Sequence, residues 1–183
     1  MRKDEDIHHI HFSADLHFLH PKIVNMCNRP ITIEEHDDWL IDRINSKVGK
    51  KDTFYILGDV SMANKEKTEK LLGRVNGNKI LIIGNHDNNI LTSTRFSEIK
   101  LIKDFNFNSL LYPNIHIVLC HYPFASWNRK TNGAMHLHGH CHGRLDNSIN
   151  GLSFDIGVDA NNYYPLNLEE VLDKMTEISL NYF

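Results

Sequence analysis

The sequence predicts an α/β fold, and its length, its short apolar runs and the helical patterns between those runs lead to this prediction. At 183 residues, with 41% apolar and 23% charged residues, the chain has the size and composition of one ordinary globular domain. Several apolar runs of strand length are bounded by glycine or by charged residues. Between them lie stretches with apolar residues at helical spacing. Such alternation favours sheets that are connected by helices.

The expected elements follow from these patterns in chain order. Strands are expected at 7–12, 54–57, 79–83, 115–120, 135–138 and 154–158. Helices are expected at 21–28, between Thr32 and Gly49, at 65–72 and at 168–175. Thr32 is expected to cap the second helix, with Glu35 completing a capping box. The segment 88–113 has no clear pattern, and its part 99–104 fits a strand or a helix.

Composition and charge exclude several classes of protein. No run approaches the roughly 18 consecutive apolar residues of a membrane span, and the start of the chain lacks the apolar stretch of a signal peptide. The 3 cysteines contain no C-x-x-C pair, so neither a disulfide framework nor a thiolate zinc site is indicated. With a net charge of -3 and scattered basic residues, stable nucleic-acid binding is not expected. We therefore expect a cytoplasmic protein that does not associate with membranes.

Polar residues follow five of the expected strands. Singly, each has a common structural explanation: an isolated Asp-x-His usually consists of polar residues at the surface of a strand, Asp59 suits a turn or a cap, and Asn85 suits an Asx-turn. Together they predict one site, because the carboxyl ends of strands far apart in sequence can share a cleft. The nitrogen- and oxygen-bearing side chains in question are Asp15, His17, Asp59, Asn85, His121, His140 and His142.

These residue types suit two divalent cations. Nitrogen and oxygen ligands without thiolate admit manganese, which we expect, and also iron, zinc, nickel or magnesium. Two divalent cations bring a charge of about +4, and the carboxylates of Asp15 and Asp59 return about -2. A hydroxide shared by the cations would take one further charge, and the remainder would hold an anionic phosphoryl group. In the same region, His86 can exchange a proton near neutral pH and Asp87 can orient an imidazole.

The motifs resemble those of a known family. Asp-x-His, Gly-Asp, Gly-Asn-His-Asp, His and Gly-His-x-His follow one another between residues 15 and 142, as in the calcineurin-like metallophosphoesterases. The segments 17–20, 28–30 and 157–165 are similar to those of the small bacterial and phage members that lack a cap domain. The resemblance implies a single domain over residues 1–183 without a cap. It also implies a four-layer α-β-β-α sandwich, in which helices flank two mixed sheets.

The resemblance further implies a role for each site residue. One metal would be held by Asp15, His17, Asp59 and His142, and the other by Asp59, Asn85, His121 and His140, so that Asp59 bridges the two. His86 would assist the leaving group and Asp87 would orient His86. The implied activity is hydrolysis of phosphomonoesters or phosphodiesters by a hydroxide that bridges the metals. A small phosphoester, for example a nucleotide, is the implied substrate.

Two other functions compete with this one. A non-catalytic scaffold would keep the fold as a binding surface, although His86 and every ligand position are present here. A nuclease acting on DNA or RNA would use Trp127 to stack on a base and Arg129 to grip phosphate, unless Trp127 packs its loop onto the sheet. His20 and Arg29 are further candidates for substrate binding, and a bidentate structural salt bridge is the alternative role for Arg29.

The remaining histidines and Cys141 are assigned structural roles. The chain has 13 histidines, which is a bias toward metal-site residue types. His136 and His138 fit either hydrogen-bond donors behind the metal ligands or satisfied structural histidines. Cys141 is expected to point away from the metals as a small apolar side chain. Surface or packing roles are expected for His8, His9, His11, His36 and His116.

Overall fold

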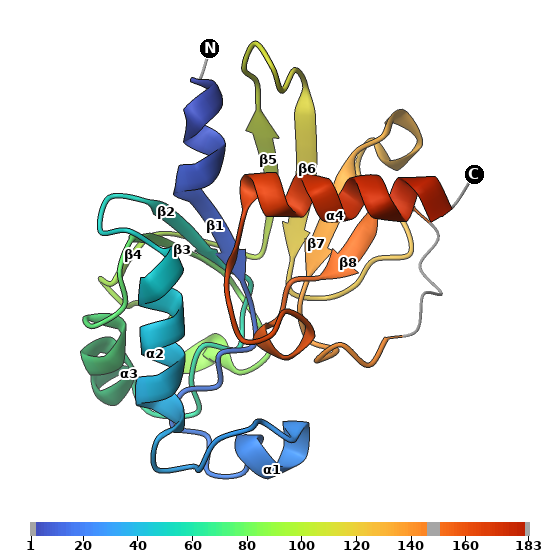
Figure 1. Ribbon diagram of the computed structural model, residues 1–183. Coiled ribbons are helices and arrows are strands. Elements are labelled where there is room, and N and C mark those ends of the chain that lie inside the picture. The colour runs from blue at the N-terminus through green and yellow to red at the C-terminus, as the bar shows by residue number, and fades with distance from the viewer. Residues whose placement is uncertain (1–2, 146–150, 182–183) are drawn as a thin grey trace.

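A computed structural model describes residues 3–145 and 151–181 of the chain. Its strands are β1 (Ile10–Ser13), β2 (Thr53–Ile56), β3 (Asn78–Ile82), β4 (Phe96–Lys100), β5 (Ile102–Phe107), β6 (Ile115–Cys120), β7 (Met135–His138), β8 (Ser153–Asp155) and β9 (Leu166–Asn167). They form a five-stranded sheet in the order β4-β3-β2-β1-β9 and a four-stranded sheet in the order β5-β6-β7-β8 (Figure 1). Strands β1 to β4 are parallel and β9 is antiparallel to β1, whereas β6 to β8 are parallel and β5 is antiparallel to β6. The prediction of an α/β fold with two mixed sheets is confirmed.

Helices connect and cover these strands. The α-helices are α1 (Ile23–Cys27), α2 (His36–Lys47), α3 (Lys65–Leu72) and α4 (Leu168–Asn181). Short 3-10 helices are η1 (Asp4–His9), η2 (Asp87–Ile90), η3 (Lys130–Asn132) and η4 (Val158–Ala160). Within the described parts of the chain, every helix is too short or too polar to cross a membrane.

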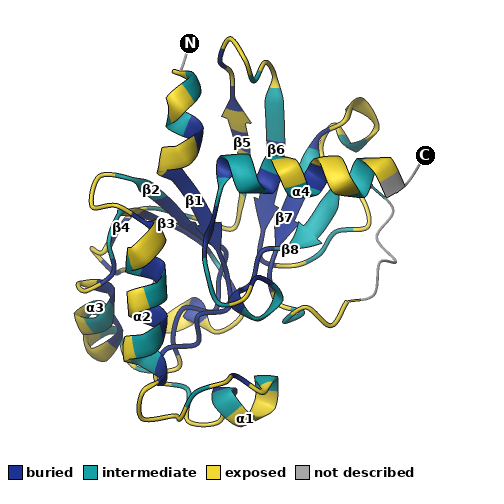
Figure 2. Ribbon diagram, viewed as in Figure 1, coloured by how far each residue is buried: buried dark blue, intermediate teal, exposed yellow. Residues whose placement is uncertain are grey.

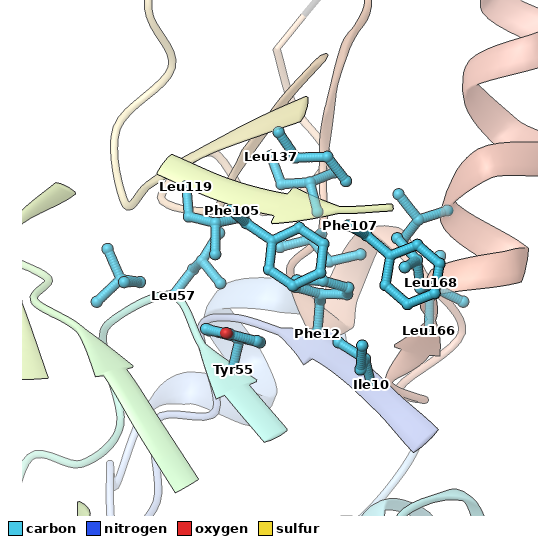
Figure 3. Packing of buried hydrophobic residues seen from close by; sticks show 14 of the residues in the cluster. Ile10, Phe12, Tyr55, Leu57, Phe105, Phe107, Leu119, Leu137, Leu166 and Leu168 are labelled. Carbon is cyan, nitrogen blue, oxygen red and sulfur yellow. The ribbon is translucent and has the colours of Figure 1, made fainter. Parts of the chain in front are cut away.

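The main core lies between the two sheets. Phe12 of β1 is fully buried there, stacks on Tyr55 of β2 at 5.2 Å between ring centroids, and meets Phe105 of β5 edge-on at 5.6 Å. Leu137 of β7 and Leu168 of α4 belong to the same cluster (Figure 3). Residues of both sheets therefore share one apolar layer, which fixes how the sheets face each other.

The outer faces of the sheets are covered differently. Leu40 and Ile44 of α2 pack with Phe54 of β2 on the outer face of the five-stranded sheet, and Figure 2 shows the buried stripe of α2 turned toward that sheet. On the four-stranded sheet, Val118 of β6 packs with Trp127, which lies in the loop between β6 and β7. Helix α4 contributes instead to the core between the sheets.

Several predicted boundaries differ from the structure at the start of the chain. Ile7, expected in the first strand, lies in η1, and β1 begins at Ile10. The predicted capping role of Thr32 is wrong, because α2 begins at His36 after Glu35 in the N-cap position. The Thr32 hydroxyl instead donates to the Glu35 carboxylate at 2.6 Å. The predicted boundaries of α3, β6 and β7 are confirmed.

The segment that the sequence left undefined contains η2 and two edge strands. β4 is the last strand of one sheet and β5 the first of the other, with Leu101 between them. The final strand was expected to reach Val158, but β8 ends at Asp155 and Val158 begins η4. The last helix, expected at 168–175, extends to Asn181.

Candidate metal centre

The loops after β1, β2, β3, β6 and β7 are joined to one another by hydrogen bonds and close polar contacts. The backbone N–H of His17, after β1, donates to the carbonyl of Asp59, after β2, at 2.9 Å. The Nδ1–H of His121, after β6, donates across to the carbonyl of Leu57 at 2.8 Å and thereby ties the second sheet to the first. The expected clustering of polar residues at the carboxyl ends of the strands is what the fold produces.

Asp15, His17 and His142 form one group that could hold a metal ion, with one ligand atom from each residue within 4.8 Å of the others. The ring of His142 stacks on that of His17 at 5.1 Å. Among the described residues, neither ring nitrogen of the buried His17 has a hydrogen-bond partner. A buried imidazole without a partner is costly, and coordination to a cation would satisfy it.

Asp59, His121 and His140 form a second group with the same mutual spacing of 4.8 Å or less. The Asn85 Oδ1 atom lies 3.0 Å from Nε2 of His121, which puts a neutral oxygen donor beside this group. The Asp59 carboxylate extends between the two groups: Oδ1 is 3.6 Å from Nε2 of His121, and Oδ2 is 3.7 Å from Nε2 of His17. Asp59 thus faces both groups at once.

Burial changes the proton affinities of the first group. It raises the pKa of Asp15 well above its ordinary value, and the charges of Asp155 and Asp59 add to the effect. Burial also lowers the pKa of His17 to about 2, with the charges of His142 and Arg29 acting in the same direction. His17 is therefore neutral and ready to ligate a cation, and a nearby cation would favour the ionised form of Asp15.

After the strand ends, the backbone is held in a conformation that residues other than glycine rarely adopt. Left-handed φ angles, from 51° to 70°, occur at five of the predicted ligands: Asp15, His17, Asp59, His140 and His142. Such strain costs free energy and concentrates at functional sites. Gly84 lets the loop after β3 approach Asp59, because a Cβ atom there would lie 2.5 Å from Oδ1 of Asp59.

His86 lies beside both groups and is open to solvent. Its side chain is 41% exposed, and its Nε2 atom is 3.9 Å from Oδ2 of Asp59. Its backbone N–H donates to Oδ1 of Asp59 at 3.0 Å, and its ring is 5.8 Å from that of His17. An exposed imidazole next to a cluster of metal-ligating residues can exchange a proton with a molecule bound there.

Comparison with known proteins gives a family for this chain. No protein-family model matches it. Over 171 residues it is 31% identical to the uncharacterized protein MJ1445 of Methanocaldococcus jannaschii, and the match covers 89% of each chain. The chain belongs to the MJ1445 family. It is also 27% identical over 184 residues to the Gene 66 protein of Mycobacterium phage L5, with 81% of this chain and 86% of the phage protein covered.

A solved structure has the same fold as this MJ1445-family protein. It is the protein of unknown function AQ665 from Aquifex aeolicus, which is 23% identical and superposes with a TM-score of 0.68. The superposition covers 91% of this chain and 98% of that one.

Asp87 does not have the role predicted for it. Instead of facing His86, its buried carboxylate accepts three backbone N–H groups: Gly84 at 2.8 Å and Asp59 at 3.0 Å on Oδ2, and Val60 at 2.9 Å on Oδ1. These bonds join the loop after β3 to the loop after β2. The carboxylate nearest the His86 ring is that of Asp59.

Arg29 is not a substrate-binding residue in this structure, and its alternative role as a structural salt bridge is confirmed. A guanidinium has five N–H donors, and each finds an acceptor inside the fold. Nε and Nη2 bind the Asp159 carboxylate at 2.9 and 2.8 Å. The other donors reach the carbonyls of Leu16 and Asp15 and Nε2 of His36.

Asp159 is a site residue that the sequence analysis missed. Its Oδ2 atom accepts from Nδ1 of His142 at 2.6 Å, so that Arg29 and Asp159 together orient a predicted metal ligand. Burial alone would raise the pKa of Asp159, but the hydrogen bonds from His142 and Arg29 bring it below its ordinary value. The signal was available in Gly157-Val158-Asp159, which lies two residues after the end of β8.

The other two candidates for substrate binding differ in position. His20 is half-buried beside the first group, and its ring meets that of His17 edge-on at 5.5 Å. Arg129 is exposed in the loop between β6 and β7, and its contact with a substrate stays a prediction. In the same loop, Trp127 is buried and its indole N–H donates to the carbonyl of Ala134 at 2.8 Å. The packing role considered for Trp127 is confirmed.

His136 is a structural histidine, which is one of the two roles considered for it. Its ring stacks on Phe124 at 5.0 Å, and its Nδ1–H donates to the carbonyl of Val118 at 2.9 Å. Burial lowers the pKa of His136 to about 4. His138 is also buried, and its Nδ1 atom is 3.0 Å from the carbonyl oxygen of Gly139.

Asp87→Ala should lower the free energy of unfolding by about 3 kcal/mol, because three buried N–H groups lose a charged acceptor. Urea unfolding at neutral pH measures this, and Asn88→Ala, an exposed neighbour, should change the value by less than about 0.5 kcal/mol. Equal stability of Asp87→Ala and Asn88→Ala would show that Asp87 does not hold the loops together.

The pKa of His136 predicts a loss of stability in acid. The folded pKa of about 4 lies below the ordinary value of 6.5, so the stability that neutral His136 contributes is present above pH 6.5 and is lost as the pH falls. Between pH 7.5 and pH 5 the loss is about 2 kcal/mol. His136→Phe should remove that part of the pH dependence in metal-free protein. If the free energy of unfolding depended on pH equally in the parent protein and in His136→Phe, His136 would not be the source of this acid sensitivity.

Proposed function

We propose that this MJ1445-family protein is a metal-dependent hydrolase of phosphomonoesters or phosphodiesters, similar to the calcineurin-like metallophosphoesterases. The position of Asp59 carries the proposal. Its two carboxylate oxygens face Nε2 of His17 and Nε2 of His121, which belong to different ligand groups. A carboxylate shared in this way is what a pair of cations needs, and two-metal sites are common in phosphatases and nucleases.

The donor set fits two divalent cations. One would be held by Asp15, His17, Asp59 and His142, and the other by Asp59, Asn85, His121 and His140. Nitrogen and oxygen donors are compatible with manganese, which we favour, and with iron, zinc, nickel or magnesium. The unpartnered ring nitrogens of His17, among the described residues, support a cation in the first group. Such cations would lower the pKa of a water molecule and offset the charge of a phosphoryl group.

The residues of the chain itself position the substrate and move the proton. His86, 41% exposed and near Oδ2 of Asp59, would donate a proton to the leaving oxygen. The Asp59 carboxylate accepts a hydrogen bond from the backbone N–H of His86 and so fixes the position of the His86 backbone, from which the imidazole extends. His20, at the rim of the first group, would contact the phosphoryl oxygens.

The finer description of the fold is part of the same proposal. We propose the metallo-dependent phosphatase fold, a four-layer α-β-β-α sandwich, as a single domain over residues 1–183 without a cap. Two mixed sheets with a shared core, and α2 over one outer face, support it. We also propose a cytoplasmic location, which the free thiols of Cys27, Cys120 and Cys141 support.

A small phosphoester, for example a nucleotide, is the proposed substrate, without stable nucleic-acid or membrane binding. The nuclease alternative depended on Trp127 as a stacking residue, and that side chain is buried against the sheet. The non-catalytic scaffold predicts that no substrate is turned over. Assays of aryl phosphate monoesters, aryl phosphate diesters and nucleotides with each divalent metal distinguish these functions.

His86→Ala should lower turnover with Mn²⁺ by about 10²- to 10⁴-fold, because the leaving oxygen loses its proton donor. Metal analysis should still find both metals bound in this variant. Asn85→Ala, in contrast, should weaken the binding of one metal. His8→Ala, at an exposed histidine in η1, is the matched control and should match the parent protein in both respects.

Two results would contradict this division of roles. Loss of metal from His86→Ala would make His86 a ligand rather than a proton donor. Absence of turnover in the parent protein with every divalent metal would favour the scaffold.

A further inference from the structure

We propose that Cys27, His142 and Asp159 form a third site, which binds a soft divalent cation of the zinc class. Sγ of Cys27 is 3.3 Å from Nδ1 of His142, and Nδ1 is 2.6 Å from Oδ2 of Asp159. The three ligand atoms lie within 4.8 Å of one another. The residues come from the end of α1, the loop after β7 and η4, so the fold brings together three distant segments.

The chemistry of these donors differs from that of the two groups in the proposed hydrolytic centre. Those groups contain imidazole and carboxylate. Here a thiolate joins an imidazole and a carboxylate, a donor set that selects zinc, cobalt or cadmium over manganese or magnesium. Asp159 is held in place by Arg29, whose Nε and Nη2 bind both carboxylate oxygens, so this ligand is already oriented.

The site is also accessible. It opens at Cys27 and His142, which are partly exposed in contrast to the buried Cys120, while the Asp159 carboxylate, 6% exposed, forms its inner wall. The guanidinium of Arg144 lies 3.9 Å from Sγ of Cys27 and would have to swing away, which an exposed side chain can do. On binding, the cation takes the place of the Cys27 thiol proton, which passes to solvent, while the single proton of the neutral His142 ring moves from Nδ1 to Nε2.

Occupation of this site would act on the hydrolytic centre through His142. The hydrogen bond from Nδ1 to Asp159 sets the orientation of the ring that we assign to the first metal. A soft cation at Nδ1 replaces that bond and draws the ring toward Cys27. Zinc in excess should therefore inhibit hydrolysis, a consequence that rests on the proposed function, whereas binding of the cation does not.

Cobalt titration tests the binding directly. Co²⁺ bound to a thiolate gives a sulfur-to-cobalt charge-transfer band in the near ultraviolet, whereas Co²⁺ bound to imidazole and carboxylate does not. The parent protein should develop this band, and Cys27→Ser should lose it. Cys141→Ser is the matched control, because Cys141 is also half-buried near the cleft but is outside all ligand groups among the described residues. It should keep the band.

Three results would overturn the proposal: no band in the parent protein, a band that persists in Cys27→Ser, or a band lost in Cys141→Ser. Circular dichroism and the visible cobalt bands of the remaining sites check that Cys27→Ser is folded. The first of these results would mean that the three residues form a hydrogen-bonded cluster that binds no cation.

Zinc inhibition tests the functional consequence. The activity of each variant is normalised to its own value with Mn²⁺ alone. The zinc concentration for half inhibition should then be at least about tenfold higher for Cys27→Ser than for Cys141→Ser. Equal zinc sensitivity would overturn inhibition through this site. If the parent protein has no turnover, the proposed function fails, while the cobalt band still decides whether the site binds a cation.

Discussion

The hydrogen bonds that the Asp87 carboxylate accepts from Gly84, Asp59 and Val60 are the interaction on which the candidate site depends. They join the loops after two neighbouring parallel strands, and the close contact of Gly84 with Asp59 leaves little freedom between these loops. Asp59 is thereby fixed between His17 and His121, and its own carboxylate fixes the backbone of His86. A buried, charged acceptor of backbone N–H groups is strong enough to maintain such an arrangement.

A second set of buried bonds supports the other side of the cleft. Arg29 connects the loop after β1 to Asp159, and Asp159 orients His142. The left-handed backbone at Asp15 and His142 costs free energy, which these charge-assisted bonds offset. Burial raises the pKa of Asp15 and so favours its protonated form in the absence of a cation, whereas it lowers the pKa of His17 and keeps that imidazole neutral and able to bind one. The protein thus holds its polar residues in place before any ligand binds.

Sequence reasoning found the residues at the strand ends because each follows an apolar run, as Asp59 follows β2 and His121 follows β6. It gave Asp87 the wrong partner and left Arg29 open between substrate binding and a salt bridge, since their partners are backbone groups and a carboxylate that become neighbours only in the folded chain. The pattern could not show the edge strands β4 and β5 either, because they are half-exposed and rich in polar residues. The predicted start of β1 was too early, because Ile7 fits the alternating pattern of a strand but is a buried residue of the 3-10 helix η1.

The central claim is that Asp59 joins two cations in one centre, and electron paramagnetic resonance of the Mn²⁺-loaded protein tests it most directly. Two Mn²⁺ ions about 3.5 to 4 Å apart and linked by a carboxylate are exchange-coupled, which changes the spectrum from that of isolated ions. The account predicts a coupled spectrum at two equivalents of Mn²⁺, and loss of the coupling in Asp59→Asn. A spectrum of isolated Mn²⁺ ions in the parent protein at that loading would contradict it.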